Sequence, residues 1–408
     1  MRFDPSRRLF VKGASLAAVG IGMQVSPLMA RAAEAATGNG TLVKIFLRGG
    51  ADGLSICVPY ADANYATLRG GIALPNPGQA GGVLDLDGYF GLHPNLAAIK
   101  PYWDSGRLGF VHAVGNYALT RSHFDAQDFM EAGTPGDKST TTGWLHRAMA
   151  AVPGAEVTQT VAFASQLPRA LLGPESVLVA SNLSTFDLRA TNWRSEAQAL
   201  LRDLYGRESG PVAEISRDTF AAMDVLRNSP AFTAGPANGA VYGNSTIANG
   251  LRQAAQVIKA AIGTRCIYIN VGGAFDTHSG QLAAHATEFQ RIGDSLAAFA
   301  TDLGTLLDDV VVMVTTEFGR TAYVNGSAGT DHGSAHCVML FGGTVNGGQV
   351  HGAWPGIATA QLYQNRDLAA TTDFRDVFAE VARGQLGLSN SVSLFPGYAT
   401  GTSLGLLA

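Results

Sequence analysis

Residues 310–320 read VVVMVTTEFGR, an apolar run that ends abruptly in a carboxylate at Glu317. A short run rich in β-branched residues predicts a buried strand. Just downstream, residues 329–336 read GTDHGSAH, which places an acid and a histidine side by side between glycines. Titratable groups are therefore concentrated here, although only 15% of the chain is charged. A solvated turn between two strands and a metal or catalytic site are both consistent with this pattern.

Similar segments alternate along the rest of the chain. Strand-like apolar runs and helix-like runs follow one another, and such alternation predicts an α/β fold with a largely parallel central sheet and helices on both faces. The predicted strands cover residues 41–50, 107–115, 265–273, 310–316 and 337–343, and the predicted helices cover 93–106, 122–133, 280–304 and 373–387. The stretch from about 190 to 262 has helical periodicity without strong strand signals, so we interpret it as a helical insertion in a domain spanning 36–408.

Polar clusters directly follow four of the predicted strands. In an open parallel sheet the carboxyl ends of the strands share one edge, and ligands bind in the crevice there. Side chains far apart in the sequence should therefore meet at that edge, and the candidates are Asp52, Ser122, His123, Asp276, His278, Glu317, Asp331 and His332.

Taken singly, each candidate also has a purely structural explanation. Glu317 needs a compensating partner at the end of a buried strand, and a salt bridge to Arg320 would serve as well as a cation. Asp52 is consistent with an Asx turn. Ser122 is either a helix N-cap or a nucleophile near the positive end of the helix dipole, where Arg121 could hold the same oxyanion.

The pairs "FDTH" (275–278) and "TDHG" (330–333) combine carboxylate and imidazole groups. Such a ligand set suits a divalent ion such as Zn²⁺, Mn²⁺ or Fe, whereas oxygen ligands alone would suit Ca²⁺ or Mg²⁺. We expect one or two ions. The Gly-rich phosphate loops of nucleotide-binding proteins and the Gly-x-Ser-x-Gly elbow of lipases are absent from the sequence.

The N-terminal region predicts export. Arg7 and Arg8 precede a weakly apolar Gly/Ala-rich stretch and then small residues suited to cleavage, which is the layout of a twin-arginine signal over residues 1–35. The apolar stretch is barely long enough to span a bilayer, so we expect cleavage, no stable transmembrane anchor, and a periplasmic or secreted protein. Removing residues 1–35 changes the formal charge from −4 to −7, which argues against a nucleic-acid partner.

Several motifs carry a family resemblance from about residue 41 to the C-terminus. The segments IFLRGGADGLSICVPY (45–60), TRSHFDAQDFMEAGTPG (120–136), GWLHRAM (143–149) and TTEFGRTAYVNGSAGTDHG (315–333) resemble the twin-arginine-exported family catalogued as domain of unknown function 1501. That family is grouped with the alkaline-phosphatase-like superfamily of phosphatases, sulfatases and metal-dependent phosphomutases. The resemblance implies a central sheet with metals and a hydroxyl nucleophile at the strand ends.

Carried over by position, the resemblance implies that Ser122 is the nucleophile. It implies metal ligation by Asp52, Asp276, His278, Glu317 and His332. Asp331, next to His332 in "TDHG", is a further candidate metal ligand from the sequence pattern. This chain has Phe318 where many relatives have a histidine, so one nitrogen ligand is missing. The acid-to-histidine spacing in "DTH" (276–278) is also shorter than the three intervening residues usual in the family. Both departures favour one metal or a degenerate site over two full metal sites.

Together these features predict an exported, metal-dependent hydrolase of small or polymeric phosphate or sulfate esters. Arg121, Ser122 and His123 would act on the substrate, and the carboxylates and later histidines would hold the metal. The alternative is an exported binding or assembly protein, with a protein partner that the sequence does not identify, in which the site has degenerated.

Overall fold

The computed structural model describes residues 40–116, 118, 120–154, 157–187 and 193–408. The predicted signal over residues 1–35 lies outside the described residues. Among the residues that are described, no helix combines the length and the apolar character needed to cross a membrane.

Within these residues, nine strands form one central sheet in the order β11-β5-β10-β9-β1-β8-β6-β7, with β12 paired to β5. All the pairings are parallel except those of β10, which runs antiparallel to both β5 and β9. The strands are β1 (Thr41–Arg48), β5 (Leu108–Gly115), β6 (Thr160–Phe163), β7 (Leu178–Val179), β8 (Cys266–Gly272), β9 (Val310–Thr316), β10 (His336–Gly342), β11 (Val350–His351) and β12 (Thr372–Asp373). A small antiparallel sheet contains β2 (Cys57–Val58), β3 (Leu84–Asp85) and β4 (Gly91–Leu92).

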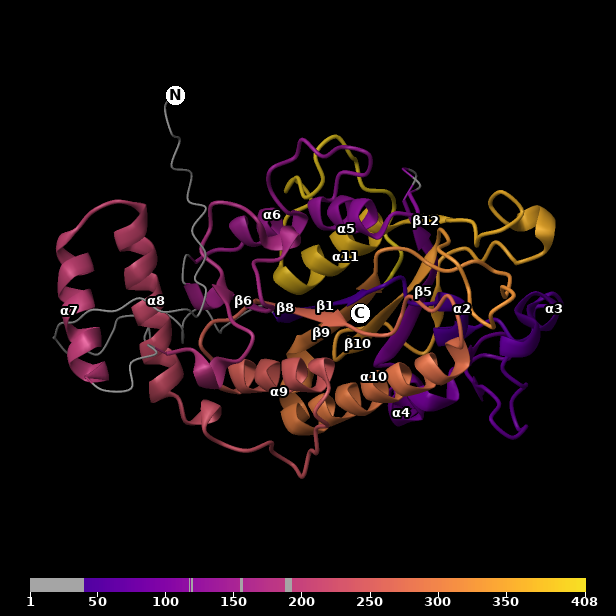
Figure 1. Ribbon diagram of the computed structural model, residues 1–408, viewed down its shortest axis with the longest axis horizontal. Helices are drawn as coiled ribbons and strands as arrows, with labels where there is room; N and C mark the ends of the chain where they lie inside the picture. The colour runs from indigo at the N-terminus through magenta and orange to yellow at the C-terminus, as the bar shows by residue number, and fades with distance from the viewer. Residues whose placement is uncertain (1–39, 117, 119, 155–156, 188–192) are drawn as a thin grey trace.

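Helices cover both faces of the central sheet (Figure 1). On one face lie α4 (Lys100–Asp104), α9 (Thr246–Lys259) and α10 (Gln281–Leu303), and on the other lie α5 (His123–Ala132), α6 (Trp144–Ala150) and α11 (Phe374–Leu386). The short helices α2 (Gly53–Ile56) and α3 (Tyr65–Arg69) follow β1. The predicted α/β fold with a mostly parallel sheet between helices is therefore confirmed.

The two-sided cover explains why the strands are continuously apolar. Successive side chains of a strand point to opposite faces, so each face of β1 supplies a different core cluster. Ile45 packs in one cluster with Leu296 of α10, while the next residue, Phe46, packs in the other with Phe378 of α11. All seven residues of β9 are buried for the same reason.

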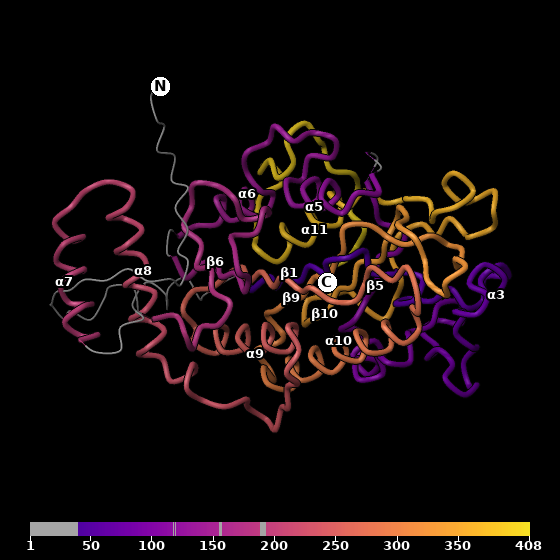
Figure 2. The backbone as a smooth tube through the Cα atoms, viewed as in Figure 1, coloured from indigo at the N-terminus to yellow at the C-terminus, as the bar shows by residue number. Residues whose placement is uncertain are grey.

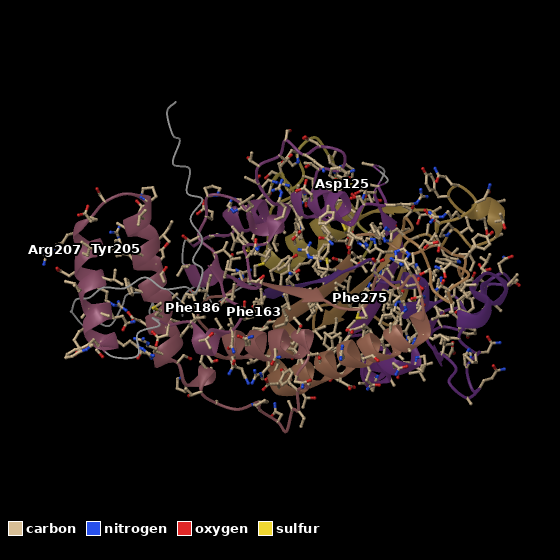
Figure 3. All side chains as sticks on the ribbon, in the orientation of Figure 1. Asp125, Phe163, Phe186, Tyr205, Arg207 and Phe275 are labelled. Carbon is tan, nitrogen blue, oxygen red and sulfur yellow. The ribbon has the colours of Figure 1, made fainter. Side chains whose placement is uncertain are left out.

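The stretch from 193 to 262 contains the helices α7 (Arg194–Arg207), α8 (Pro211–Asn228) and α9, with an irregular segment between α8 and α9 and no strand. The chain trace in Figure 2 shows α7 and α8 as a helix pair at the far end of the sheet, whereas α9 lies along the sheet beside α10. The labelled Phe163 and Phe186 lie between the sheet and this helix pair (Figure 3), and both belong to the core cluster that continues to Leu201 of α7 and Phe220 of α8. The helix pair is thus joined to the main body through apolar packing.

The strand directions bring distant polar segments to one edge. Strands β1, β5, β8 and β9 all end there, because they run the same way. Since β10 runs in the opposite direction, it begins at that edge, and the residues just before it, including Asp331 and His332, join the loops that follow the other strands.

Candidate metal centre

Three loops carry the side chains that meet at this edge. His123 is the first residue of α5, Asp276 and His278 follow β8, and His332 precedes β10. Phe275, which is fully buried beside the sheet (Figure 3), anchors the loop that presents Asp276. The centre is therefore built from segments that adjoin strands of the sheet, an arrangement typical of functional sites.

The ring nitrogens of three histidines converge on the carboxylate of Asp276. His332 Nε2 lies 3.0 Å from Asp276 Oδ1 and 3.0 Å from His123 Nε2, and His123 Nε2 lies 3.3 Å from Asp276 Oδ2. His278 Nε2 lies 3.0 Å from Asp276 Oδ1 and 3.0 Å from His332 Nε2. Ligand atoms around one tetrahedral zinc ion lie at roughly this spacing, about 3.3 Å, because Zn–N bonds are about 2.0–2.1 Å long.

The hydrogen-bond partner of Nδ1 in each histidine ring indicates which ring nitrogen carries the proton. His123 Nδ1 lies 2.7 Å from a Glu317 carboxylate oxygen, His278 Nδ1 lies 2.8 Å from an Asp331 carboxylate oxygen, and His332 Nδ1 lies 2.7 Å from the Arg121 carbonyl oxygen. These oxygens can only accept hydrogen bonds, so each Nδ1 is the donor. In the neutral rings, each Nε2 therefore presents a lone pair to the centre.

When all three rings are neutral, the Nε2 atoms and the carboxylate of Asp276 are all acceptors, and such a group needs a positive charge among its members. Imidazole lone pairs 3.0 Å apart repel each other and the nearby carboxylate unless a cation or added protons lie between them. Metal-ligating histidines almost always donate their other ring nitrogen to a carboxylate or carbonyl, as all three do here. His123, Asp276 and His332 each offer one ligand atom, and these atoms lie within 4.8 Å of one another. The residues therefore fit a divalent cation, and His278 is placed to supply a further ligand.

Asp276 is held in its ionised form by Arg320, whose Nη1 donates to Asp276 Oδ1 over 2.7 Å. Burial acts to raise the pKa of Asp276, but the hydrogen bond and charge of Arg320 outweigh it and bring the pKa to about 2. The Arg320 guanidinium is fully buried and also donates to Thr330. Arg320 is thus paired with Asp276 and not with Glu317, the partner that the sequence suggested.

Glu317 contacts the centre through His123. Its side chain accepts hydrogen bonds from His123 Nδ1, from Gln127 Nε2 at 2.8 Å, from the Gly49 N–H at 2.9 Å and from the Thr316 hydroxyl at 2.9 Å. Burial acts to raise its pKa, but the hydrogen bonds from His123 and Gln127 bring it to about 2. Glu317 thus contacts the Nδ1 side of His123, away from the Nε2 atom that faces Asp276, and orients the ring. The carboxylate oxygens of Glu317 already accept hydrogen bonds from these donors.

Asp52 lies in a second, fully buried network. Its carboxylate forms an ion pair with Arg69 and accepts hydrogen bonds from the Ser55 hydroxyl at 2.7 Å and from Gln281 Nε2 at 2.7 Å. Burial acts to raise the pKa of Asp52, but the charge of Arg69 more than offsets this and lowers it. A guanidinium thus occupies the position beside Asp52 where a second cation would bind. Within the described residues, Asp52 is connected to the centre indirectly, through hydrogen bonds of Gln281, Thr330 and Arg320.

This arrangement makes a strong stability prediction for Arg69. We expect Arg69→Met to lower the free energy of unfolding by about 3–5 kcal/mol, because it leaves the Asp52 charge buried without its partner. The matched control is Arg107→Met, which removes the exposed pair with Asp308 and should cost about 1 kcal/mol or less. Chemical denaturation of the two variants measures the difference. Equal losses would show that the buried pair has no special role.

Ser122 and Arg121 lie beside the centre, at the start of α5. Ser122 is the N-cap of this helix, and its hydroxyl accepts a hydrogen bond from the Asp125 N–H at 3.4 Å, the only hydrogen bond of this hydroxyl within the described residues. The Arg121 side chain pairs with Asp367 at 2.7 Å, while its carbonyl orients His332. Asp331 orients His278 and is about half exposed.

The structure also identifies residues that the sequence analysis did not select. Gln127, Arg69 and Gln281 all support a carboxylate at this edge. The sequence contains one usable signal for them: Gln127 follows His123 by four residues, a spacing that puts both side chains on one face of a helix.

Comparison with known proteins establishes the family. The model of the family described as protein of unknown function (DUF1501) matches residues 113–394, so the chain belongs to this family and the predicted membership is confirmed. No curated protein matches the chain. Among solved structures, a phosphonate monoester hydrolase from Silicibacter pomeroyi is similar with a TM-score of 0.33 and 12% sequence identity, over 90% of this chain and 76% of that one.

Proposed function

We propose that this member of the DUF1501 family is a metal-dependent hydrolase of phosphate or sulfate esters. The observation that carries the proposal is the set of three imidazole Nε2 atoms that face Asp276, each in a ring whose Nδ1 has a hydrogen-bond acceptor. The class of ester is supported by the motifs that resemble the alkaline-phosphatase-like superfamily.

The residues divide into those that hold the metal and those that act on the ester. His123, His278, His332 and Asp276 would hold one divalent ion, which supplies Lewis-acid stabilisation of charge on an ester oxygen. Ser122 is the proposed nucleophile. It caps the N-terminus of α5, where backbone N–H groups and the helix dipole favour an anion.

The chemistry assigned to the chain has two stages. Ser122 Oγ forms a bond to phosphorus or sulfur and the alcohol leaves, after which water cleaves the serine ester and regenerates the hydroxyl. The Arg121 guanidinium, whose side chain is 40% exposed, is proposed to contact a non-bridging oxygen of the same group. His123 takes part through the metal, because its ring nitrogens face Asp276 and Glu317.

The proposal also covers the cellular context. We propose export by the twin-arginine pathway on the basis of Arg7 and Arg8. The sequence pattern described above also supports a separate signal, followed by one domain with a helical insertion. The same pattern argues against a nucleic-acid partner, because the chain without its signal is acidic. Zn²⁺, Mn²⁺ and Fe remain the proposed ions, because the ligands combine nitrogen and carboxylate oxygen.

A substrate panel combined with chelation tests this function. We expect the purified protein to hydrolyse at least one aryl phosphate or aryl sulfate ester, to lose this activity after chelation, and to regain it with a single type of divalent ion. Failure to hydrolyse any ester, in a protein that retains its ion, would favour the binding or assembly role. Hydrolysis that resists chelation and removal of the ion would refute the metal mechanism.

A further inference from the structure

We propose that Gln127 is a positioning residue for the metal centre: it holds Glu317 against His123 and keeps the Arg48 guanidinium away from that carboxylate. The inference rests on the proposed metal centre and adds to it a residue whose side chain hydrogen-bonds to Glu317 and Arg48.

A polar stripe on α5 provides the first observation. His123, Gln127 and Glu131 follow one another at intervals of four residues, so they share one face of this helix. His123 and Gln127 both contact the same oxygen, Glu317 Oε1, at 2.7 and 2.8 Å. Glu131 is buried and pairs with Arg48 at 2.9 Å. The stripe therefore connects the centre with a charged pair in the interior.

The orientation of the Gln127 amide follows from its two neighbours. An ionised carboxylate can only accept and a guanidinium can only donate, so Nε2 must face Glu317 and Oε1 must face Arg48. Arg48 Nη1 accordingly donates to Gln127 Oε1 over 2.9 Å. Arg48 is itself fixed by Glu131 and by Asn270 Oδ1, which accepts from Arg48 Nε at 2.7 Å.

The neutral amide thus separates a carboxylate from a guanidinium. If Gln127 lost its polar group, Glu317 Oε1 would lose a donor and Arg48 could move to pair with it directly. A guanidinium at Glu317 would compete with the His123 Nδ1–H for the same oxygen, and the ring would lose the contact that fixes its tautomer and orientation. Outer hydrogen bonds of this kind typically change metal affinity by about 10–100-fold.

The test uses Gln127→Met, which keeps the length of the side chain and removes both polar atoms. With Co²⁺ as the probe, we expect the Kd of the full-length chain to rise by about 10–100-fold and the visible absorption of the bound Co²⁺ to change, because the orientation of His123 is no longer fixed. The matched control is Gln256→Met. Gln256 is also a half-buried glutamine on a helix, and its Nε2 donates a hydrogen bond to the Phe232 carbonyl oxygen. It lies on α9, which contributes no side chain to the proposed centre. This control should bind Co²⁺ as the wild type does.

A second variant, Gln127→Glu, keeps the shape of the side chain but presents an acceptor to Glu317, and we expect a loss of Co²⁺ affinity at least as large. If Gln127→Met folds poorly, the Gln127→Glu result decides. Wild-type Kd and wild-type absorption in either variant would overturn the inference while leaving the metal centre in place. A wild-type chain that binds no Co²⁺ would overturn the centre and this inference with it.

Discussion

Ser122→Ala is expected to abolish ester hydrolysis, by a factor of roughly 10³ or more, while the protein keeps its metal and its fold. Among the described residues, the structural loss is the N-cap hydrogen bond of α5, which costs about 0.5–2 kcal/mol of unfolding free energy. Steady-state hydrolysis of a responsive ester, measured together with thermal unfolding, checks both parts of this expectation.

Ser122→Asp separates capping from catalysis. Aspartate is a good N-cap, so the stability of this variant should remain close to that of the wild type. Hydrolysis should still fail, because the carboxylate would occupy the position of the substrate oxyanion. Wild-type rates in either variant would contradict the role of Ser122 and would shift the assignment to a water nucleophile.

Asp276→Asn should have the largest effect on metal binding, and we expect the affinity for Co²⁺ to fall by at least about 100-fold. Asp276 is the only carboxylate in contact with all three Nε2 atoms among the described residues, and the substitution removes its charge while keeping its size. The control is Asp331→Asn, which removes the charge of the group that accepts from His278 Nδ1 and should cost less. Co²⁺ titrations of the two variants give the comparison, and equal losses would count against Asp276 as a direct ligand.

The fold could be predicted from the sequence because its strands are covered on both faces. Segments such as residues 310–316 are apolar at every position, and polar residues follow where the strand leaves the sheet. Convergence of the segments that follow β1, β5, β8 and β9 at one edge follows from the parallel direction of these strands. The reversed direction of β10 could not be predicted, since an apolar run carries no information about its direction, yet this reversal brings the residues before β10 to the centre.

The partners of the charged residues were harder to predict than their location. Glu317 and Arg320 are three residues apart, which made a local salt bridge a reasonable interpretation. In the structure, Arg320 pairs with Asp276, which lies 44 positions away, and Glu317 pairs with His123, which lies 194 positions away. Such pairings depend on which loops the sheet brings together, and periodicity within a segment does not reveal them.

Asp52 illustrates the same limit. Its position after a buried strand suggested a metal ligand or an Asx turn, and nothing near it in the sequence marks Arg69 as its partner. The pairing arises because the fold brings Arg69, the last residue of α3, against the loop after β1, where both groups are buried. A buried carboxylate always needs a compensating group, but whether that group is a metal ion or a guanidinium is decided by tertiary contacts.

The central claim is that His123, His278, His332 and Asp276 bind one divalent ion, and elemental analysis of the purified wild-type protein tests it most directly. We expect about one tightly bound transition-metal or zinc ion per chain. Protein purified with added metal that contains no stoichiometric ion would contradict the claim.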